Sequence, residues 1–276
     1  MTNAKIIIIG GGTMGSALAR QLITARRFAR TDLAIVEHNT GQRVRIRQLG
    51  FKTVASLSAI NFSSVSVVIL SVKPQDAMPL LDNLNGRINS KTLVISIMAG
   101  VKLNTLSRTL NHRRVIRCMP NLALTVGLGM TGWLAAPACT SADQRQARNI
   151  FSAFGLEMPV ASDDAIDRIT AVSGSGPGYF FAFARDLIAA AQALGFSESA
   201  ANRLVKQTLI GAAKLFKHSE LPPKDLFKQV ASKRGTTMAA DAVLRRSGYA
   251  KIWARALRAA YNQARAISRE NEGRSK

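Results

Sequence analysis

The chain has 276 residues, enough for one large domain or two modest ones, and we expect two. Hydrophobic residues make up 47% of it, yet no uncharged apolar run is long enough to span a membrane. No secretory signal is expected at the N-terminus, because a short run of isoleucines leads directly into glycines instead of a cleavage site. These features predict a soluble, cytoplasmic protein with no membrane partner.

The cysteine and histidine content argues against a metal site. The two cysteines, Cys118 and Cys139, are too few for a disulfide framework. They lie in no metal-ligand spacing with the three histidines. We therefore expect no structural metal.

The charge is strongly positive, with 38 Lys and Arg against 16 Asp and Glu and a formal net charge of +22. Such a balance suits a nucleic-acid binder, but the cations are scattered over every predicted helix without an aromatic or base-reading motif. In the last helix they align along one face: Lys251, Arg255, Arg258, Arg265 and Arg269. A solvated outer face is favoured over a nucleic-acid surface, and the charge also suits an anionic cofactor and substrate.

A buried strand and a glycine turn organise the first domain. Four consecutive isoleucines at residues 6–9 are typical of a central strand of a parallel sheet. Gly10, Gly12 and Gly15 then follow the G-x-G-x-x-G spacing, and residues 14–25 read as a helix. The free N–H groups and positive dipole end of that helix would face a pyrophosphate, so the turn predicts a dinucleotide site.

A second strand is expected at residues 32–36 and a short helix at 42–49. Glu37 follows the strand, about twenty residues beyond the glycines, where an acid accepts hydrogen bonds from the adenosine ribose and favours NAD. Two alternatives stay open: Glu37 is a solvated strand end, or it turns aside while neighbouring donors hold the 2′-phosphate of NADP. Those donors are His38, Asn39, Thr40 and Arg43.

Three more strands, expected at residues 65–71, 93–97 and 114–118, each end in a small or Pro-containing turn. In an open, doubly wound α/β sheet these turns meet the glycine turn at the carboxyl edge. The expected cofactor-binding residues are Gly10, Gly12, Thr13, Met14, Gly15, Glu37, His38, Asn39, Val72, Lys73, Pro74, Ala99, Gly100, Met119, Pro120 and Asn121. The cofactor is NADP or NAD.

A change of composition marks the second domain. A helix at 141–153 and a strand at 157–160 complete the nucleotide domain, residues 1–162. Residues 163–276 have no β-branched run and are expected to be all helical. Five helices are predicted in this domain. Three have both ends assigned, at residues 179–194, 197–216 and 249–269. Between the second and the last of these, a short helix ends at Val230 and another begins at Thr236 or Thr237. Their apolar surface indicates burial by a second subunit, in a homodimer or higher homo-oligomer.

Several motifs together resemble the pyrroline-5-carboxylate reductase family. They are the glycine turn and residues 72–75, 96–101, 117–121, 173–177, 211–214 and 235–237. The resemblance implies a Rossmann domain followed by a helical domain that dimerises by interleaving. It also implies hydride transfer from NADPH or NADH to the C=N carbon of a cyclic imino acid, which gives proline.

The resemblance places the substrate at residues 232–237. There the N–H groups of Gly235, Thr236 and Thr237, with the hydroxyls of Ser232 and Thr237, suit a carboxylate; the alternative is an ordinary helix cap. By resemblance Glu220 lies near the ring nitrogen and stabilises the protonated imine, although on its own it reads as a solvated loop acid. Thr237, close to that nitrogen in the family, orients it or relays a proton.

Two departures from the family pattern keep other functions open. Lys233 and Arg234 replace a Pro-Gly pair, and Leu122 and Ala123 replace a Thr-Pro pair. A paralogous imine reductase for a related or more acidic imino acid is one alternative. A non-catalytic nucleotide- or nucleic-acid-binding relative is another.

Overall fold

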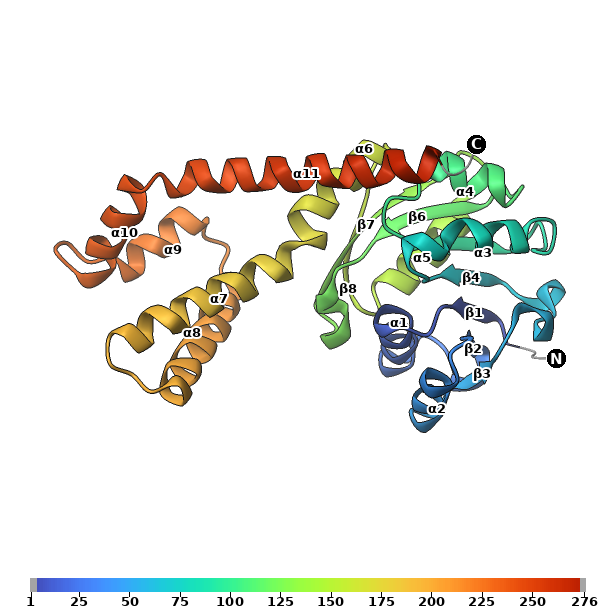
Figure 1. Ribbon diagram of the computed structural model, residues 1–276, viewed down its shortest axis with the longest axis horizontal. Helices are drawn as coiled ribbons and strands as arrows, with labels where there is room; N and C mark the ends of the chain where they lie inside the picture. The colour runs from blue at the N-terminus through green and yellow to red at the C-terminus, as the bar shows by residue number, and fades with distance from the viewer. Residues whose placement is uncertain (1–3, 274–276) are drawn as a thin grey trace. The chain divides into compact units, whose positions relative to one another are not determined.

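The computed structural model describes residues 4–273, and the chain divides into two compact units (Figure 1). The first unit contains the residues up to 176 and those from 260 onward, and the second contains residues 177–259. No helix among residues 4–273 is long and apolar enough to cross a membrane.

Eight strands of the first unit form one sheet in the described part of the chain, in the order β3-β2-β1-β4-β5-β6-β7-β8. The strands are β1 Ile6–Ile9, β2 Leu33–Val36, β3 Lys52–Val54, β4 Val67–Leu70, β5 Leu93–Ser96, β6 Val115–Met119, β7 Gly129–Ala135 and β8 Gly155–Pro159. The β6–β7 pair is antiparallel and every other pair is parallel. The expected parallel-dominated Rossmann sheet is confirmed.

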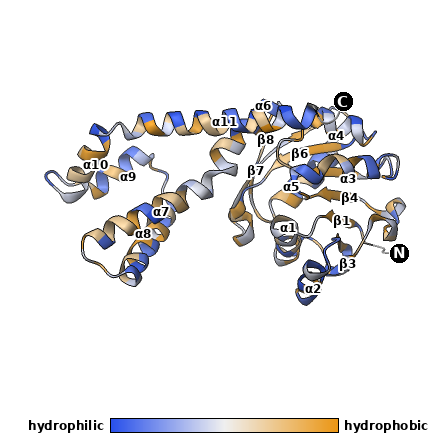
Figure 2. Cartoon of the chain, viewed as in Figure 1, coloured by the Kyte–Doolittle hydropathy of each residue, from blue (hydrophilic) through white to orange (hydrophobic). Residues whose placement is uncertain are grey.

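The central strands are buried on both faces, which is why they read as unbroken hydrophobic runs. Every residue of β1, β2, β4 and β5 is buried, and Figure 2 shows hydrophobic residues along β1 and β4. The covering helices are α1 Thr13–Thr24, α2 Thr40–Gln48, α3 Ala77–Leu84, α4 Leu103–Thr109, α5 Ser141–Phe151 and α6 Asp163–Ile169. A sheet covered on both faces requires this near-continuous apolar pattern.

The strand order reverses at β1, which lies between β2 and β4. In register, Ile8 is opposite Ile35 on one side and Ile69 on the other. In open α/β sheets such a reversal leaves a crevice at the carboxyl ends of the strands. The glycine turn follows β1 at this point.

Strand β7 was not foreseen, because two of its seven residues are glycines. Gly132 is required by packing: a Cβ there would lie 2.3 Å from Cδ1 of Ile169 in α6. Its neighbour Trp133 is 2% exposed and packs 6.1 Å from the Phe151 ring. Strand β7 needs glycine where α6 packs closely against it. Glycine interrupts the alternation of apolar and β-branched residues by which a strand is predicted from sequence.

The second unit is helical, as expected. It comprises most of α7 Gly176–Ala193, then α8 Glu198–His218, α9 Pro223–Val230, α10 Thr236–Arg246, and the first half of α11 Tyr249–Gly273. Between residues 177 and 259 only Ala201 and Val205 are buried. Many large apolar side chains of this unit are therefore exposed in the single chain.

The compact units do not follow the expected division at residue 162. Residues 163–176 group with the sheet, because α6 packs on β7 and its Asp163 and Asp167 bind Arg117 of β6. Helix α11 runs to Gly273 instead of ending at Arg269, and its part from 260 onward also groups with the first unit. The assignment of function to residues 1–162 and 163–276 stays a prediction.

Candidate functional site

The three glycines of the first turn each meet a different steric demand. Gly10 has φ +101°, and a Cβ there would lie 2.4 Å from the Ser71 carbonyl oxygen. A Cβ on Gly15 would lie 2.0 Å from the Gly10 carbonyl oxygen, so α1 packs directly on the turn. At Gly12 an added Cβ would meet no atom within 4 Å, which leaves the backbone open to a ligand. Gly10 thus forms the tight turn, Gly15 allows the close approach of the helix, and Gly12 leaves the backbone exposed. These are the three roles of the glycines in a dinucleotide-binding fingerprint.

The N-terminus of α1 is open to an anion. Its N-cap is Gly12, which has no side chain to accept hydrogen bonds from the first-turn N–H groups. The turn itself is held firmly, because Ser16 Oγ and Gln42 Nε2 both donate to the Gly11 carbonyl, at 2.6 and 2.7 Å. A rigid helix end with free N–H groups suits a phosphate.

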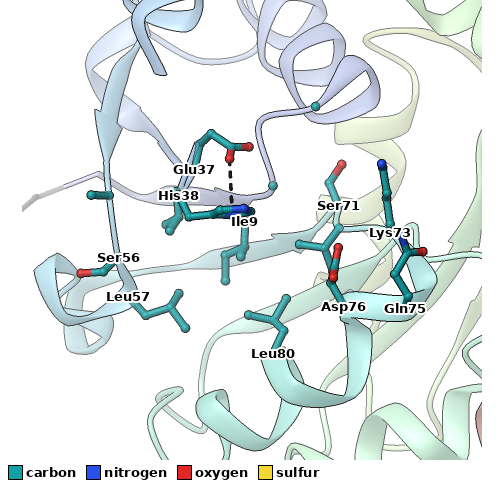
Figure 3. Close-up of a pocket in the computed structure, with 15 residues that line it drawn as sticks. Ile9, Glu37, His38, Ser56, Leu57, Ser71, Lys73, Gln75, Asp76 and Leu80 are labelled. Carbon is teal, nitrogen blue, oxygen red and sulfur yellow. Dashed lines mark ion pairs between the residues drawn. The ribbon is translucent and has the colours of Figure 1, made fainter. Parts of the chain in front are cut away.

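Glu37 is fixed at the end of β2 and is only 8% exposed. Its Oε2 accepts a hydrogen bond from the Gly11 N–H at 2.9 Å, and its Oε1 accepts one from the Asn39 N–H at 2.8 Å. His38 Nδ1 lies 3.5 Å from Oε1 (Figure 3). Glu37 is therefore not a solvated strand end, and turning it aside would break both backbone hydrogen bonds.

Two of the polar side chains next to Glu37 make hydrogen bonds within the β2–α2 connection. Asn39 caps α2, its Oδ1 accepting from the Gln42 N–H at 2.9 Å. Arg43 donates to the carbonyls of Glu37 and His38, at 3.0 and 2.6 Å, and to the Thr40 hydroxyl at 3.0 Å. These bonds stabilise the β2–α2 connection, and the cap on α2 uses the oxygen of the Asn39 amide, not its N–H donor.

Two cavities adjoin at the carboxyl edge of the sheet. The first, of about 450 Å³, lies between the β1, β2 and β4 ends and is lined by Gly10, Glu37 and Leu57 among others (Figure 3). The second, of about 460 Å³, is lined by residues such as Thr13, Ala99 and Met119. Both share Gly12, Ser71, Val72 and Lys73. Together they have the two-part shape that a dinucleotide needs.

Most of the expected cofactor residues line these cavities. They are Gly10, Gly12, Thr13, Met14, Glu37, His38, Val72, Lys73, Pro74, Ala99, Met119, Pro120 and Asn121. The remaining three, Gly15, Asn39 and Gly100, lie directly behind the lining and shape its turns.

Sequence reasoning missed Ser71, which lines both cavities. Its buried Oγ has no hydrogen-bond partner among the described residues. A buried hydroxyl without a partner is costly unless a ligand or water completes it. The available signal was its position as the last residue of a strongly apolar strand, immediately before Val72.

The side chain of Asn121 connects two segments of backbone beside the second cavity. Its Nδ2 donates to the Ser173 carbonyl and hydroxyl at 3.2 and 3.1 Å, and its Oδ1 accepts from the Met130 N–H at 3.2 Å. Gly174 lines the cavity beside it. The side chain thus ties the end of β6 to the turn that precedes α7.

The expected substrate residues lie in the second unit. Ser232 accepts a hydrogen bond on its carbonyl from the Gly235 N–H at 2.9 Å, which closes a turn, and Arg234 in that turn has φ +64°. Helix α10 begins at Thr236 with Gly235 as its N-cap. The alternative of an ordinary Ser or Thr cap is not observed, because the N-cap residue has no side chain.

The two expected catalytic side chains differ in exposure. Thr237 is half-buried in the first turn of α10, and Glu220 is exposed in the connection between α8 and α9. The cofactor residues all belong to the first unit, whereas these residues belong to the second.

Both thiols of this chain are free and buried. Burial raises the pKa of the Cys118 thiol far above its ordinary range, although Arg117 opposes the shift. Burial also raises the pKa of Cys139. Within residues 4–273 no group of three or more metal-binding side chains is found. Neither cysteine therefore offers a thiolate for catalysis or metal binding.

The fold and the two cavities define a class: an oxidoreductase with a Rossmann domain for a nicotinamide dinucleotide. Residues 5–100 match the family model described as NADP oxidoreductase, coenzyme F420-dependent. Residues 163–267 match the model described as pyrroline-5-carboxylate reductase dimerisation.

Pyrroline-5-carboxylate reductases from other organisms match nearly all of the chain. A pyrroline-5-carboxylate reductase from Synechocystis is 36% identical over 95% of this chain and 98% of its own length. The solved structure of one from Coxiella burnetii is 31% identical with a TM-score of 0.84, covering 97% of this chain and 99% of that one. That of Plasmodium falciparum pyrroline carboxylate reductase, with NADP bound, is 25% identical with a TM-score of 0.84 over 97% and 99% of the two chains. The chain belongs to the pyrroline-5-carboxylate reductase family.

Proposed function

We propose that this protein reduces 1-pyrroline-5-carboxylate to L-proline, the last step of proline biosynthesis, with NADH or NADPH as the reductant. The observation that carries the proposal is the 36% identity to a reductase of that name over 95% of the chain. The paired cavities at the sheet edge support it. We place the reaction in the cytoplasm, with no nucleic acid or membrane as partner.

The first unit fits a nicotinamide dinucleotide. The open backbone at Gly12 and the uncapped N-terminus of α1 suit the pyrophosphate, and the unpartnered Ser71 hydroxyl lies beside them. The first cavity, with Glu37, would hold the adenosine half. The second, between Ala99 and Met119, would hold the nicotinamide, which supplies the hydride when bound.

The second unit would hold the imino acid. Its carboxylate is assigned to the N–H groups of Gly235, Thr236 and Thr237 at the open end of α10, with the Ser232 and Thr237 hydroxyls beside them. Glu220 would stabilise the protonated imine, which is the better hydride acceptor. In this scheme residues 1–162 bind the cofactor, and residues 163–276 bind the substrate and form the homodimer.

The direct test is a turnover assay. Purified protein is mixed with 1-pyrroline-5-carboxylate and with NADH or NADPH, and the loss of absorbance of the reduced nicotinamide is followed. We expect turnover with at least one cofactor. No turnover with either one would overturn the proposal.

A second candidate is an imine reductase for a more acidic imino acid. Lys233 and Arg234 are both exposed on the substrate turn, where the family resemblance places proline and glycine. Two cations there would attract a second carboxylate. The same assay with cyclic imines carrying one and two carboxylates separates the candidates, since only this one expects the dicarboxylate to be preferred.

Thr237 gives the sharpest test of the chemistry. We predict that Thr237→Ala lowers kcat roughly a hundredfold, the usual size of a lost proton-transfer or orienting group, while the Kd of the cofactor stays within twofold. Steady-state kinetics and fluorescence titration of the cofactor measure the two effects. Thr236→Ala is the matched control, because it keeps the backbone N–H of the same helix turn. Equal kcat values for the two variants would remove the catalytic role.

A substitution of Glu37 tests whether this carboxylate binds the adenosine ribose of the cofactor. We predict that Glu37→Ala lowers kcat/KM for NADH about tenfold and lowers it less for NADPH, because the carboxylate accepts from ribose hydroxyls and repels a 2′-phosphate. Asp76→Asn, an acid lining the same cavity, is the control. If both cofactors lost the same factor, Glu37 would have no part in cofactor choice.

A further inference from the structure

The loop between β5 and α4 is held by the last turns of the chain. Ala99 lines the second cavity, and the next residue, Gly100, has φ +72°. The Gly100 carbonyl accepts a hydrogen bond from Asn271 Nδ2 at 3.1 Å, and Asn271 is 5% exposed. A residue at the end of α11 thus fixes the backbone next to a cavity-lining residue.

The contact between loop and helix leaves no free space. A Cβ on Gly100 would lie 2.5 Å from Cγ2 of Ile267 and 3.0 Å from Nδ2 of Asn271. The residue after Asn271, Glu272, has its Oε2 2.9 Å from Lys102 Nζ at the end of the same loop. The path of residues 99–102 is therefore set by the face of α11 against which they pack.

Helix α11 is itself anchored through a buried ion cluster, whose Asp163 also accepts a hydrogen bond from the Leu103 N–H at 3.1 Å, directly after the loop. Arg117 of β6, 2% exposed, donates to Asp163 at 2.5 Å and to Asp167 at 2.8 Å. Ser268 of α11 donates its hydroxyl to Asp167 at 3.2 Å. The chain thus offers two separable contacts on one helix face: Ser268, which docks the helix, and Asn271, which holds the loop.

We infer that Asn271 is a positioning residue for the cofactor: by holding the Gly100 carbonyl it sets the wall of the cavity in which the nicotinamide would lie. The inference rests on the proposed function, since it takes that cavity as the cofactor site. Without the amide donor, a buried carbonyl is left without its partner, and the loop turns to satisfy it. The lining residue Ala99 moves with it.

The test compares Asn271→Ala with Ser268→Ala in the full-length protein. Each variant removes the side-chain hydrogen bonding of one α11 residue to the rest of the first unit, so we expect both to lower the melting temperature. Only Asn271→Ala is expected to raise the Kd and KM of NADH and NADPH, by roughly tenfold, the size of a lost buried hydrogen bond. The KM of the imino acid should stay within twofold, and Asn271→Gln, which keeps the amide donor, should recover part of the affinity.

Two outcomes would overturn the inference: unchanged cofactor affinity in Asn271→Ala, or an equal loss in Ser268→Ala, which would show a merely structural role. If Asn271→Ala fails to fold, Asn271→Asp, which keeps the size and loses the donor, decides in its place. Failure of the wild-type protein to bind or oxidise either cofactor would refute the proposed function instead, so the two failures are distinct.

Discussion

The two units of this chain differ in where their apolar side chains go. In the first unit the strands β1, β2, β4 and β5 are buried at every position, and helices cover them. In the second, only Ala201 and Val205 are buried between residues 177 and 259. Phe180 and Phe181 of α7 remain 68% and 64% exposed. The first unit completes its core with its own residues, whereas the second leaves its apolar faces uncovered.

We conclude from this difference that the exposed apolar side chains of the second unit belong to an interface between subunits. So many exposed large apolar side chains in one region are uncommon on a protein that stays monomeric. The region matches the dimerisation model of the family over residues 163–267, so the chain forms a homo-oligomer. Part of the stability of the second unit thus depends on protein concentration, in contrast to that of the first.

The largest expected effect comes from charging the uncovered face. We predict that the double variant Phe180→Glu and Phe181→Glu weakens self-association at least a hundredfold and abolishes turnover. It removes two aromatic rings that the interface would bury and puts unpaired charges in their place. Sedimentation equilibrium over a range of concentrations measures the association.

The matched control places the same charges on the first unit. Val44, in the middle of α2, and Leu49, its C-cap residue, are 46% and 47% exposed. Their double replacement by Glu is expected to leave the association unchanged, since the first unit needs no partner to cover them. An intact oligomer in the Phe180 and Phe181 variant would refute the interface.

The second-largest effect is expected in the first unit, whose core needs no partner subunit. Phe151 is 1% exposed and packs 6.1 Å from the Trp133 ring and 6.2 Å from the Phe154 ring. We predict that Phe151→Ala lowers the free energy of unfolding of the first unit by about 3–5 kcal/mol. Urea unfolding followed by tryptophan fluorescence measures the loss.

The chain offers a clean reporter for this measurement. It has two tryptophans, Trp133 in the first unit and Trp253 in the second, so a Trp253→Phe background leaves Trp133 as the only emitter. In that background the midpoint should not depend on protein concentration. A loss below about 1 kcal/mol would mean that the site collapses to fill the space.

The smallest predicted effect is a pH dependence confined to the first unit. Burial lowers the pKa of His112 below its ordinary value of 6.5, although its Nε2 is 2.8 Å from the Thr92 carbonyl. The folded state therefore holds this imidazole neutral. Its contribution to stability is complete above pH 6.5 and is lost as the pH falls through the folded-state pKa.

The measurement is a series of melting temperatures from neutral to mildly acidic pH. The wild type should lose on the order of 2 °C more than His112→Gln on acidification, because the variant has no imidazole to protonate. His218→Gln, at an exposed histidine of α8, should follow the wild type. Parallel curves for wild type and His112→Gln would contradict the prediction.

The features that the sequence predicted are those set by local rules. The isoleucine run, the glycine spacing and the start of α10 at Thr236 follow from side-chain period, backbone sterics and helix ends. These rules placed thirteen of the expected cofactor residues on the cavity walls, without any knowledge of the tertiary structure.

The features that escaped prediction depend on contacts between distant residues. The glycine-rich β7 needs Ile169 to explain it, and the two backbone hydrogen bonds of Glu37 are visible only in three dimensions. The part of α11 beyond residue 259 has the same helical pattern as the part before it, so nothing local distinguishes the unit that each half joins. Ser71 became a candidate only through its missing partner.

The first unit is built from two stretches of sequence that are separated by the second unit. This separation sets the order in which its parts leave the ribosome. Residues 177–259, about eighty in number, are translated between its main part and its last helical turns, which takes on the order of ten seconds at roughly 5–20 residues per second. During that interval the sheet and its glycine turn exist without Asn271 at Gly100. A nascent chain that stops short of the final turns would keep its sheet and lack the last support of its cofactor loop.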